Sequence, residues 1–414
     1  MAITKGVILV GGPSRGTRFR PLSLDTPKPL FPLGGYPIIH HHVKALSQVS
    51  DLKEILLIGF FEESVFQPFL NEAKRDFPNI NVRYLREYQA LGTAGGLYHF
   101  RDQITSQNPD GFFVLHADVM SSFPLEQLKQ FHVSKNSVGT VMGTQVAKEL
   151  ATNFGCLVAD EKTQEVLHYV EKPESFVSNL ISTGIYYFSC NIFDYIKKAR
   201  DGTLSNQTPD LEYVITTTDD KLRLEQDLLQ PMAGSQTIYV YETAEPWVQI
   251  TTASSALPAN QLCLKQLAKS NPELMAKTQE GSYEVSGEVF VHPTATIDSS
   301  AKIGPNVFIG ANVTIGKGSR VRDSLILDNT QIKDNSCVIH SIIGWDGRVG
   351  NWCRIEGSAP ANGSFDNVTK HGIKTQSTTV LGRDVSIRDE TIIRNCMVLP
   401  HKELKDNFHN EILM

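Results

Sequence analysis

A six-residue repeat in the last third of the chain restricts its fold more than any other feature. Aliphatic residues recur at every sixth position, and glycine follows three of them, at positions 304, 310 and 316. This period predicts a left-handed parallel β-helix, in which each side of a triangular coil is one short strand with its aliphatic side chain pointing inward. The residues in this register are Val291, Ile297, Ile303, Ile309, Ile315 and Val321.

The repeat continues in two further registers separated by an interruption. Residues 357–379 lack the period and are rich in Ser, Asn, Thr and Gly. We expect this segment to be a flexible loop that leaves the β-helix, and long loops in compact domains are usually disordered or functional. The inward residues expected on either side are Ile326, Ile332, Val338, Val349 and Ile355, then Leu381, Ile387, Ile393 and Leu399.

The first 255 residues alternate strand-like and helix-like segments instead. Several segments are continuous apolar runs, which suit strands buried on both faces, and residues 37–50 and 63–76 have helical spacing. We expect a doubly wound, Rossmann-like α/β sheet, whose ligands bind beyond the carboxyl ends of the strands. The expected strands are 6–10, 54–59, 81–85, 111–116, 138–146, 166–170, 184–188 and 237–242.

The resulting domain organisation has three parts: an α/β domain at 1–255, a linker at 256–284 and the β-helix at 285–414, with its insertion at 357–379. The linker is read as a helix over 256–277, where the sequence is ALPANQLCLKQLAKSNPELMAK. A chain of this length is expected to form more than one domain.

Composition excludes several classes of function. The net charge of −6 argues against a nucleic-acid-binding surface, and no apolar run is long enough to span a bilayer. The six cysteines are scattered without a CxxC pair, so neither a zinc site nor a disulfide framework is indicated. We expect a cytoplasmic protein with reduced thiols that binds neither nucleic acid nor membranes.

The loop after the first expected strand has the features of an anion site. Gly11 and Gly12 let the backbone approach a ligand closely, and Arg18 is the best placed of three arginines. Lys28 lies between two prolines that stiffen the chain around its charge. The loop is neither a Walker A sequence nor GxGxxG. The structural alternative is a solvated basic loop.

Together with motifs further along, this loop resembles the sugar nucleotidyltransferases, and among them the GDP-mannose pyrophosphorylases (mannose-1-phosphate guanylyltransferases). The motifs follow the family's order over nearly the whole chain, and the hexapeptide repeat completes the match. They are GGPSRGTRFRPLSLDTPKPL at 11–30, REYQALGTAGGLYHF at 86–100, FFVLHADV at 112–119, YVEKPESFVSNLISTGIYYF at 169–188 and LEQDLLQPMAG at 224–234.

The resemblance assigns a role to individual residues. Glu87 and the backbone of Leu91 and Gly92 would contact the nucleoside, while Glu171 would bind sugar hydroxyls and Lys172 a phosphate. The nucleotide-sugar site as a whole is expected at Gly11, Gly12, Arg18, Lys28, Glu87, Leu91, Gly92, Asp118, Glu171, Lys172, Gly184 and Gln249.

Asp118 corresponds to a metal-binding aspartate, and Arg18 and Lys28 would serve catalysis if the chain is active. In structural terms Asp118 could merely cap a turn after a buried strand, and Glu171 with Lys172 could form an exposed pair of small energetic consequence.

Three departures from active members resemble the non-catalytic alpha subunits of this family. Gln249 stands in WVQIT, where a second metal-binding aspartate is usual, and an amide is a poor ligand for a hard dication. Pro13-Ser14-Arg15 occupies a stretch that usually holds one residue, and Ser182 replaces an asparagine.

The resemblance implies a regulatory subunit that binds GDP-mannose without a cofactor, assembles with a catalytic beta subunit and inhibits it when product accumulates. Self-association and a role of the 357–379 loop at the partner's active site are also implied. The alternative is an active mannose-1-phosphate guanylyltransferase, which converts GTP and mannose 1-phosphate to GDP-mannose and pyrophosphate and requires Mg²⁺ at Asp118. An acyltransferase using His340 or His371 is a third hypothesis, since hexapeptide-repeat proteins often carry that chemistry.

Overall fold

The computed structural model describes residues 3–12, 16–202, 221–278, 281–358, 368–370, 373–375 and 377–414. The chain forms two compact units: a first unit of Met1–Arg15 and Ile39–Trp247, and a second unit of Gly16–Ile38 and Val248–Met414. All six cysteines are free thiols. Within the part of the chain that the structure describes, no helix is both long and apolar enough to cross a membrane.

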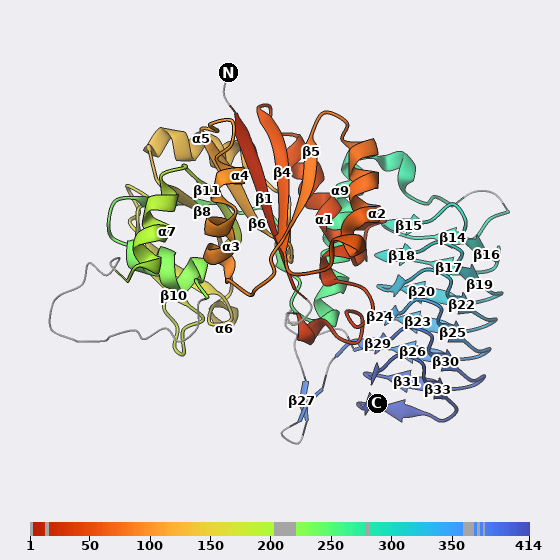
Figure 1. Cartoon of the computed structure of the whole chain (residues 1–414). Coiled ribbons are helices and arrows are strands. Elements are labelled where there is room, and N and C mark those ends of the chain that lie inside the picture. The colour runs from red at the N-terminus through yellow and green to blue at the C-terminus, as the bar shows by residue number, and fades with distance from the viewer. Residues whose placement is uncertain are drawn as a thin grey trace. The chain divides into compact units, whose positions relative to one another are not determined.

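The first unit is built on a mixed sheet with the strand order β10-β9-β11-β6-β1-β4-β5, to which β8 and β12 add beyond β11 (Figure 1). Strands β6, β1, β4 and β5 are parallel, whereas β11 runs antiparallel to β6 and β8. All eight expected strands are present, and β9 is an additional strand that the sequence pattern did not predict. The bounds are β1 Thr4–Gly11, β4 Leu52–Gly59, β5 Asn81–Arg86, β6 Gly111–His116, β8 Gly139–Gln145, β9 Gly155–Ala159, β10 Val166–Glu171, β11 Leu180–Phe188 and β12 Ile238–Glu242.

Helices cover both faces of this sheet. Alternate residues of a strand point to opposite faces, so a strand that is apolar throughout needs a partner on each side. Gly6 of β1 allows Leu46 of α1 (Ile38–Ser47) to pack against one face: a Cβ at Gly6 would lie 2.8 Å from Leu46 Cδ1. The next residue, Val7, belongs to the core cluster on the other face, with Leu97 of α3 (Thr93–His99) and Ile196 of α7 (Ile192–Arg200). The expected doubly wound arrangement is confirmed.

The remaining helices connect or flank these elements. They are α2 Glu63–Asp76, α4 Arg101–Ile104, α5 Leu125–Lys135, α6 Lys148–Ala151, the π-helical turn Leu224–Leu229, α8 Gln230–Met232 and, in the second unit, α9 Ala256–Ser270. Helix α9 ends seven residues before the expected Lys277, because Pro272 disfavours a helical conformation at Asn271.

The second unit contains the predicted β-helix as three parallel sheets of short strands. The first sheet is β14 (Glu284–Val285), β17 (Lys302–Ile303), β20 (Arg320–Arg322), β23 (Cys337–Ile339), β26 (Arg354–Glu356), β31 (Ile392–Arg394) and β34 (Phe408–His409). The second sheet is β15 (Val289–Val291), β18 (Val307–Ile309), β21 (Leu325–Ile326), β24 (Ser341–Ile343), β29 (Thr379–Leu381), β32 (Met397–Val398) and β35 (Ile412–Leu413). The third sheet is β16 (Thr296–Ile297), β19 (Thr314–Ile315), β22 (Gln331–Ile332), β25 (Arg348–Val349), β30 (Ser386–Ile387) and β33 (Glu403–Leu404).

The corner between the first and second sheets explains the slips in the repeat. Ile303 pairs with Val321 in the first sheet, but Ile309 pairs with Ile326, so later coils are one residue shorter. By the same shortening Val398, not Leu399, stacks on Leu381, and the inward position expected for Leu399 is wrong. The side chain of Val398 is fully buried. The shorter corners hold a non-glycine residue at positive φ, as Asn395 does at 51°.

This register gives a matched pair of substitutions. Val398→Ala should destabilise the β-helix by about 1–3 kcal/mol, because it removes buried methyl groups from the stack. Leu399→Ala should cost less than about 1 kcal/mol, since this side chain lies outside the stack. Urea unfolding of the two variants checks the register, and equal losses would contradict it.

The insertion in the β-helix contains regular structure that the sequence did not predict. Strands β27 (Val368–Lys370) and β28 (Ile373–Thr375) pair antiparallel as a short hairpin. His371 and half of the other residues of this insertion lie outside the described residues.

The outer face of the second sheet explains why residues 16–38 belong to the second unit. Its outward row is apolar and buried, and Gly35 lies so close to it that a Cβ there would be 2.7 Å from Phe290. Phe31 packs edge-on against Trp345 at 5.8 Å between ring centroids, and the Arg383 guanidinium lies over the same indole. The β-helix therefore anchors residues 16–38, which contain Arg18 and Lys28. The outward row is Phe290, Phe308, Leu325, Ile342 and Val380.

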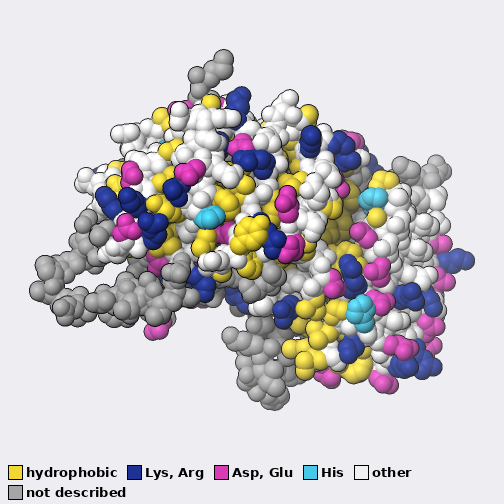
Figure 2. All heavy atoms as spheres, in the orientation of Figure 1, with side chains coloured by type: hydrophobic (Ala, Val, Ile, Leu, Met, Phe, Trp, Pro, Cys, Tyr) yellow, Lys and Arg dark blue, Asp and Glu magenta, His cyan; other side chains and the backbone are white. Residues whose placement is uncertain are grey.

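The end of the same sheet is exposed. Figure 2 shows charged side chains of both signs spread over the β-helix and hydrophobic side chains gathered towards its C-terminal end. In the last coil Ile412 is 62% exposed and Met414 is 83% exposed.

Candidate functional site

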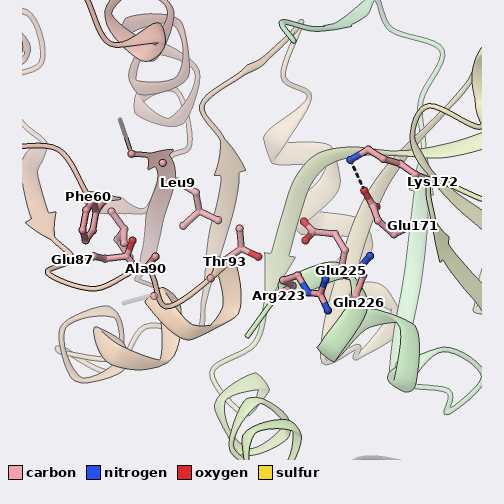
Figure 3. Close-up of a pocket in the computed structure, with 15 residues that line it drawn as sticks. Leu9, Phe60, Glu87, Ala90, Thr93, Glu171, Lys172, Arg223, Glu225 and Gln226 are labelled. Carbon is pink, nitrogen blue, oxygen red and sulfur yellow. Dashed lines mark ion pairs between the residues drawn. The ribbon is translucent and has the colours of Figure 1, made fainter. Parts of the chain in front are cut away.

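A cavity of about 610 Å³ lies in the first unit, at the carboxyl ends of β1, β4, β5 and β10 (Figure 3). Its volume falls in the range of small-molecule sites. The position is the one expected for a ligand of a doubly wound sheet. The described residues that line it are Leu9, Gly11, Gly12, Ile58, Phe60, Glu87, Ala90, Gly92, Thr93, Gly96, Glu171, Lys172, Arg223, Glu225 and Gln226.

The glycine pair that ends β1 forms one wall of the cavity. Gly11 has a φ of 73° and accepts a hydrogen bond from the Phe60 amide at 2.8 Å. A Cβ at Gly12 would lie 2.8 Å from Cβ of Phe60. These glycines therefore have a structural role in addition to the predicted one, because they let the chain after β4 pass close to β1.

Glu87 places a carboxylate in the cavity without a partner of its own. Its Oε1 is buried and has no hydrogen-bond partner among the described residues. Burial raises the pKa of Glu87 to about 7. The carboxylate lies against Gly96, where a Cβ would be 2.3 Å from Oε1. A ligand with two adjacent N–H donors would satisfy this carboxylate.

The backbone beside Glu87 is fixed by the segment that precedes the π-helical turn. Gly92 has a φ of 80°, and a Cβ there would lie 2.3 Å from the Leu222 carbonyl oxygen. The Leu91 carbonyl accepts a hydrogen bond from the Leu222 amide at 2.8 Å. Contacts of Leu91 and Gly92 with a nucleoside remain a prediction.

The opposite end of the cavity is charged. Lys172 forms an ion pair with Glu171 at 3.0 Å, and the Tyr169 hydroxyl donates to the other oxygen of Glu171 at 3.1 Å. Glu171 and Lys172 are thus brought to the same cavity as Glu87. Arg223, Glu225 and Gln226 also line this end, although none of them was predicted individually as a site residue. For Glu225 and Gln226 the available signal was the motif at 224–234, whereas Arg223 lies just before that motif.

A buried polar network supports Glu225. Its Oε1 lies 3.2 Å from Nε2 of His116 and accepts a hydrogen bond from the Tyr186 hydroxyl at 3.2 Å. Burial alone would lower the pKa of His116, but its contact with Glu225 raises that pKa above the usual value. Burial would raise the pKa of Glu225, and the contact with His116 lowers it below the usual value. Each partner therefore favours the charged form of the other.

Asp118 and Gly184 lie elsewhere in the first unit. Asp118 is in the turn between β6 and β7 (Val119–Ser121), and Gly184 is within β11 with a φ of 77°. Among the described residues, no cluster of three or more His, Cys, Asp or Glu side chains is placed to hold a metal ion. A metal ion at Asp118 remains a prediction.

Three predicted site residues belong to the second unit. Lys28 donates a hydrogen bond to the Ile250 carbonyl at 3.0 Å, so this lysine lies beside the residue that follows β13 (Trp247–Gln249). Arg18 is exposed in a single turn, Thr17–Phe19. The longer stretch of the opening loop, Pro13 to Arg15, lies outside the described residues.

Of the two histidines in the acyltransferase hypothesis, His340 occupies a corner of the β-helix. His340 has a φ of 49° and is 8% exposed, and burial lowers its pKa. Its position serves the shortened corner between the first and second sheets, which is a structural role.

Comparison with known families places two matches end to end. A family described as "Nucleotidyl transferase" matches residues 5–263, and a family described as "GMPPB C-terminal domain" matches residues 285–413. A solved structure of a putative glucose-1-phosphate thymidylyltransferase from Bacillus anthracis aligns with a TM-score of 0.52 and 23% identity, covering 63% of this chain and 95% of that chain. This likeness concerns the fold alone.

Curated relatives match over the full length. "Probable mannose-1-phosphate guanyltransferase" of Schizosaccharomyces pombe is 48% identical and covers all of both chains. "Mannose-1-phosphate guanylyltransferase regulatory subunit alpha" of Dictyostelium discoideum is 47% identical, over 99% of each chain. The protein named regulatory subunit alpha-B in Danio rerio is 45% identical, over 99% of this chain and 100% of its own.

Proposed function

This chain belongs to the nucleotidyl transferase family, among the mannose-1-phosphate guanylyltransferase alpha chains, and we propose that it is a regulatory, GDP-mannose-binding subunit. The resemblance drawn from the motifs is thereby confirmed at the level of the family. The subunit senses GDP-mannose in the cytoplasm and inhibits a catalytic subunit of the same family when this product accumulates.

The polar side chains that line the cavity carry the proposal. Glu87 offers an ionisable carboxylate with a buried, unpartnered oxygen, which suits the N1–H and N2–H₂ donors of guanine. Glu171 and Lys172 offer an acceptor for sugar hydroxyls and a charge for a phosphate at the other end. Gly11, Gly12 and the backbone of Leu91 and Gly92 complete the pocket in this proposal, with Asp118 and Gly184 of the same unit as further ligand contacts.

The two positions expected to hold a catalytic metal do not suit one. Mg²⁺ prefers carboxylates, and the two expected ligand positions hold one carboxylate, Asp118, and one amide, Gln249. Binding of a finished nucleotide sugar needs no metal, so the proposal contains no metal-dependent step.

The partners in this proposal are GDP-mannose, a catalytic subunit and a second copy of the chain. The printed names of the relatives call them regulatory subunits, which supports assembly with a catalytic chain. The insertion at 357–379 is the proposed contact with that subunit's active site. The exposed apolar side chains of the last coil support self-association.

Calorimetry combined with an activity assay tests the proposal. GDP-mannose should bind the purified chain with the same affinity in Mg²⁺ and in EDTA. The same preparation should release no pyrophosphate from GTP and mannose 1-phosphate. Absence of binding, or turnover at the rate of an active enzyme, would overturn it.

The second candidate is an active mannose-1-phosphate guanylyltransferase, which the name of the fission yeast relative favours. Under the regulatory proposal Gln249→Asp should restore at most a small fraction of an active enzyme's turnover, because the three-residue stretch from Pro13 to Arg15 remains. The assay is pyrophosphate release in Mg²⁺, with Gln249→Ala as the control. Full turnover in Gln249→Asp would show that the longer loop does not matter.

A further inference from the structure

The two ends of the cavity differ in chemistry. Figure 3 shows Phe60, Glu87 and Ala90 on one side, and Glu171, Lys172 and Glu225 on the other, with Leu9 and Thr93 between them. One end therefore offers an aromatic ring and one carboxylate, and the other concentrates charged side chains. A ligand with a base at one end and a polyhydroxylated group at the other fits this division.

Glu225 and Glu171, at 15% and 19% exposure, are the least exposed charged side chains of this end. The exposed fraction is 59% for Lys172 and 61% for Arg223. Two strands fix the carboxylate of Glu225, through His116 at the end of β6 and Tyr186 in β11. The Tyr186 hydroxyl in turn lies 3.3 Å from Oγ of Ser182. A buried carboxylate fixed in this way is a directional acceptor.

The polar partners of Glu225 belong to the protein itself. Nε2 of His116 lies 3.2 Å from Oε1 of Glu225, and His116 is not among the described residues that line the cavity. The carboxylate nevertheless lines the cavity, so it faces both the imidazole and the ligand space. An anionic acceptor repels phosphate and favours hydroxyl donors.

We propose that Glu225, positioned by His116, is a specificity-determining residue that accepts hydrogen bonds from hydroxyl groups of the ligand's hexose ring. It acts together with Glu171, so that two carboxylates line the hexose end of the cavity. A pair of fixed acceptors discriminates between ring epimers, because a hydroxyl of the wrong configuration leaves a buried acceptor unpaired. This inference rests on the proposed binding of GDP-mannose.

The test compares two ligands on the same variants. Glu225→Gln should weaken GDP-mannose binding about tenfold and leave GDP binding within about twofold, because GDP lacks the hexose. The discrimination of GDP-mannose from GDP-glucose should shrink by a similar factor. Glu174→Gln, an exposed carboxylate in the loop after Lys172, is the matched control and should change neither affinity.

His116→Asn tests the positioning role independently. It removes the imidazole next to Glu225 without changing a residue that lines the cavity. It should therefore also raise the ratio of the dissociation constant for GDP-mannose to that for GDP. Thermal unfolding of each variant establishes that it is folded, and calorimetry supplies both affinities.

Each outcome has a distinct meaning. If the natural protein binds neither ligand, the proposed function fails. If it binds GDP-mannose and Glu225→Gln keeps the ratio of the two affinities, through no loss or an equal loss of both, the hexose role of Glu225 is wrong and the proposed function stands. An unchanged ratio in His116→Asn would overturn its positioning role.

Discussion

Glu54→Ala is expected to lower the free energy of unfolding of the first unit by about 3–5 kcal/mol. Lys5 of β1 is fully buried, and its ammonium lies 2.9 Å from Oε2 of Glu54 on the neighbouring strand β4. Without this carboxylate Lys5 keeps hydrogen bonds to the Gln103 carbonyl and the Ser106 hydroxyl but loses its buried countercharge. Urea unfolding, followed through the transition of the first unit, measures the loss of free energy.

Two controls separate burial from charge pairing at this site. Arg83 also pairs with Glu54, at 2.8 Å, but is 42% exposed, so Arg83→Ala should cost no more than about 1 kcal/mol. The double variant Lys5→Met with Glu54→Leu should recover most of the loss, because it removes both charges together. A loss below about 1 kcal/mol in Glu54→Ala would show that Lys5 does not need its partner.

The affinity for GDP-mannose is expected to fall about tenfold between pH 8 and pH 6. The pKa of Glu87 is raised by burial to about 7, so the carboxyl group is mostly protonated at pH 6 and mostly ionised at pH 8. In the proposed complex guanine presents two N–H donors to Glu87, so only the ionised carboxylate accepts both of them, and binding below the pKa must release a proton. Calorimetry across this range measures the dependence.

The sign and the source of this dependence are both testable. The diphosphate of GDP-mannose is esterified at both ends and has no ionisation in this range, so the ligand does not contribute. Glu87→Gln should bind more weakly at pH 8 and lose the pH dependence. Glu62→Gln, which changes a glutamate that is 64% exposed and paired with Arg86, should keep it. A dependence that persists in Glu87→Gln would assign it to another group.

Much of the fold could be read from the sequence because it is encoded locally. The six-residue period fixes which residues of a coil point inward, and the apolar runs fix the buried strands. The error at Leu399 arises because Val398 and Leu399 are both aliphatic, so the period alone did not show that the corner before them is one residue shorter. Strand β9 was missed because its short segment shows neither alternation nor a long apolar run.

The site was predictable only in part. The motifs indicated Glu87, Glu171 and Lys172, and the structure places all three on one cavity. Glu225 and His116 were not predicted as a pair, because their meeting depends on how β6 and the π-helical turn pack and not on their spacing in the chain. Binding of a nucleotide sugar by the predicted residues stays a prediction.

The sequence alone determined the two architectures and the chemistry available, because periodicity, glycine positions and carboxylates are properties of short segments. Only the tertiary structure decided that residues 16–38, with Arg18 and Lys28, are anchored on the β-helix through Phe31, Trp345 and Gly35. That choice follows from an apolar outer row on one sheet, which has to be covered to be kept from water. Local patterns state which side chains must be buried, whereas the partner that buries them is chosen by packing across the whole chain.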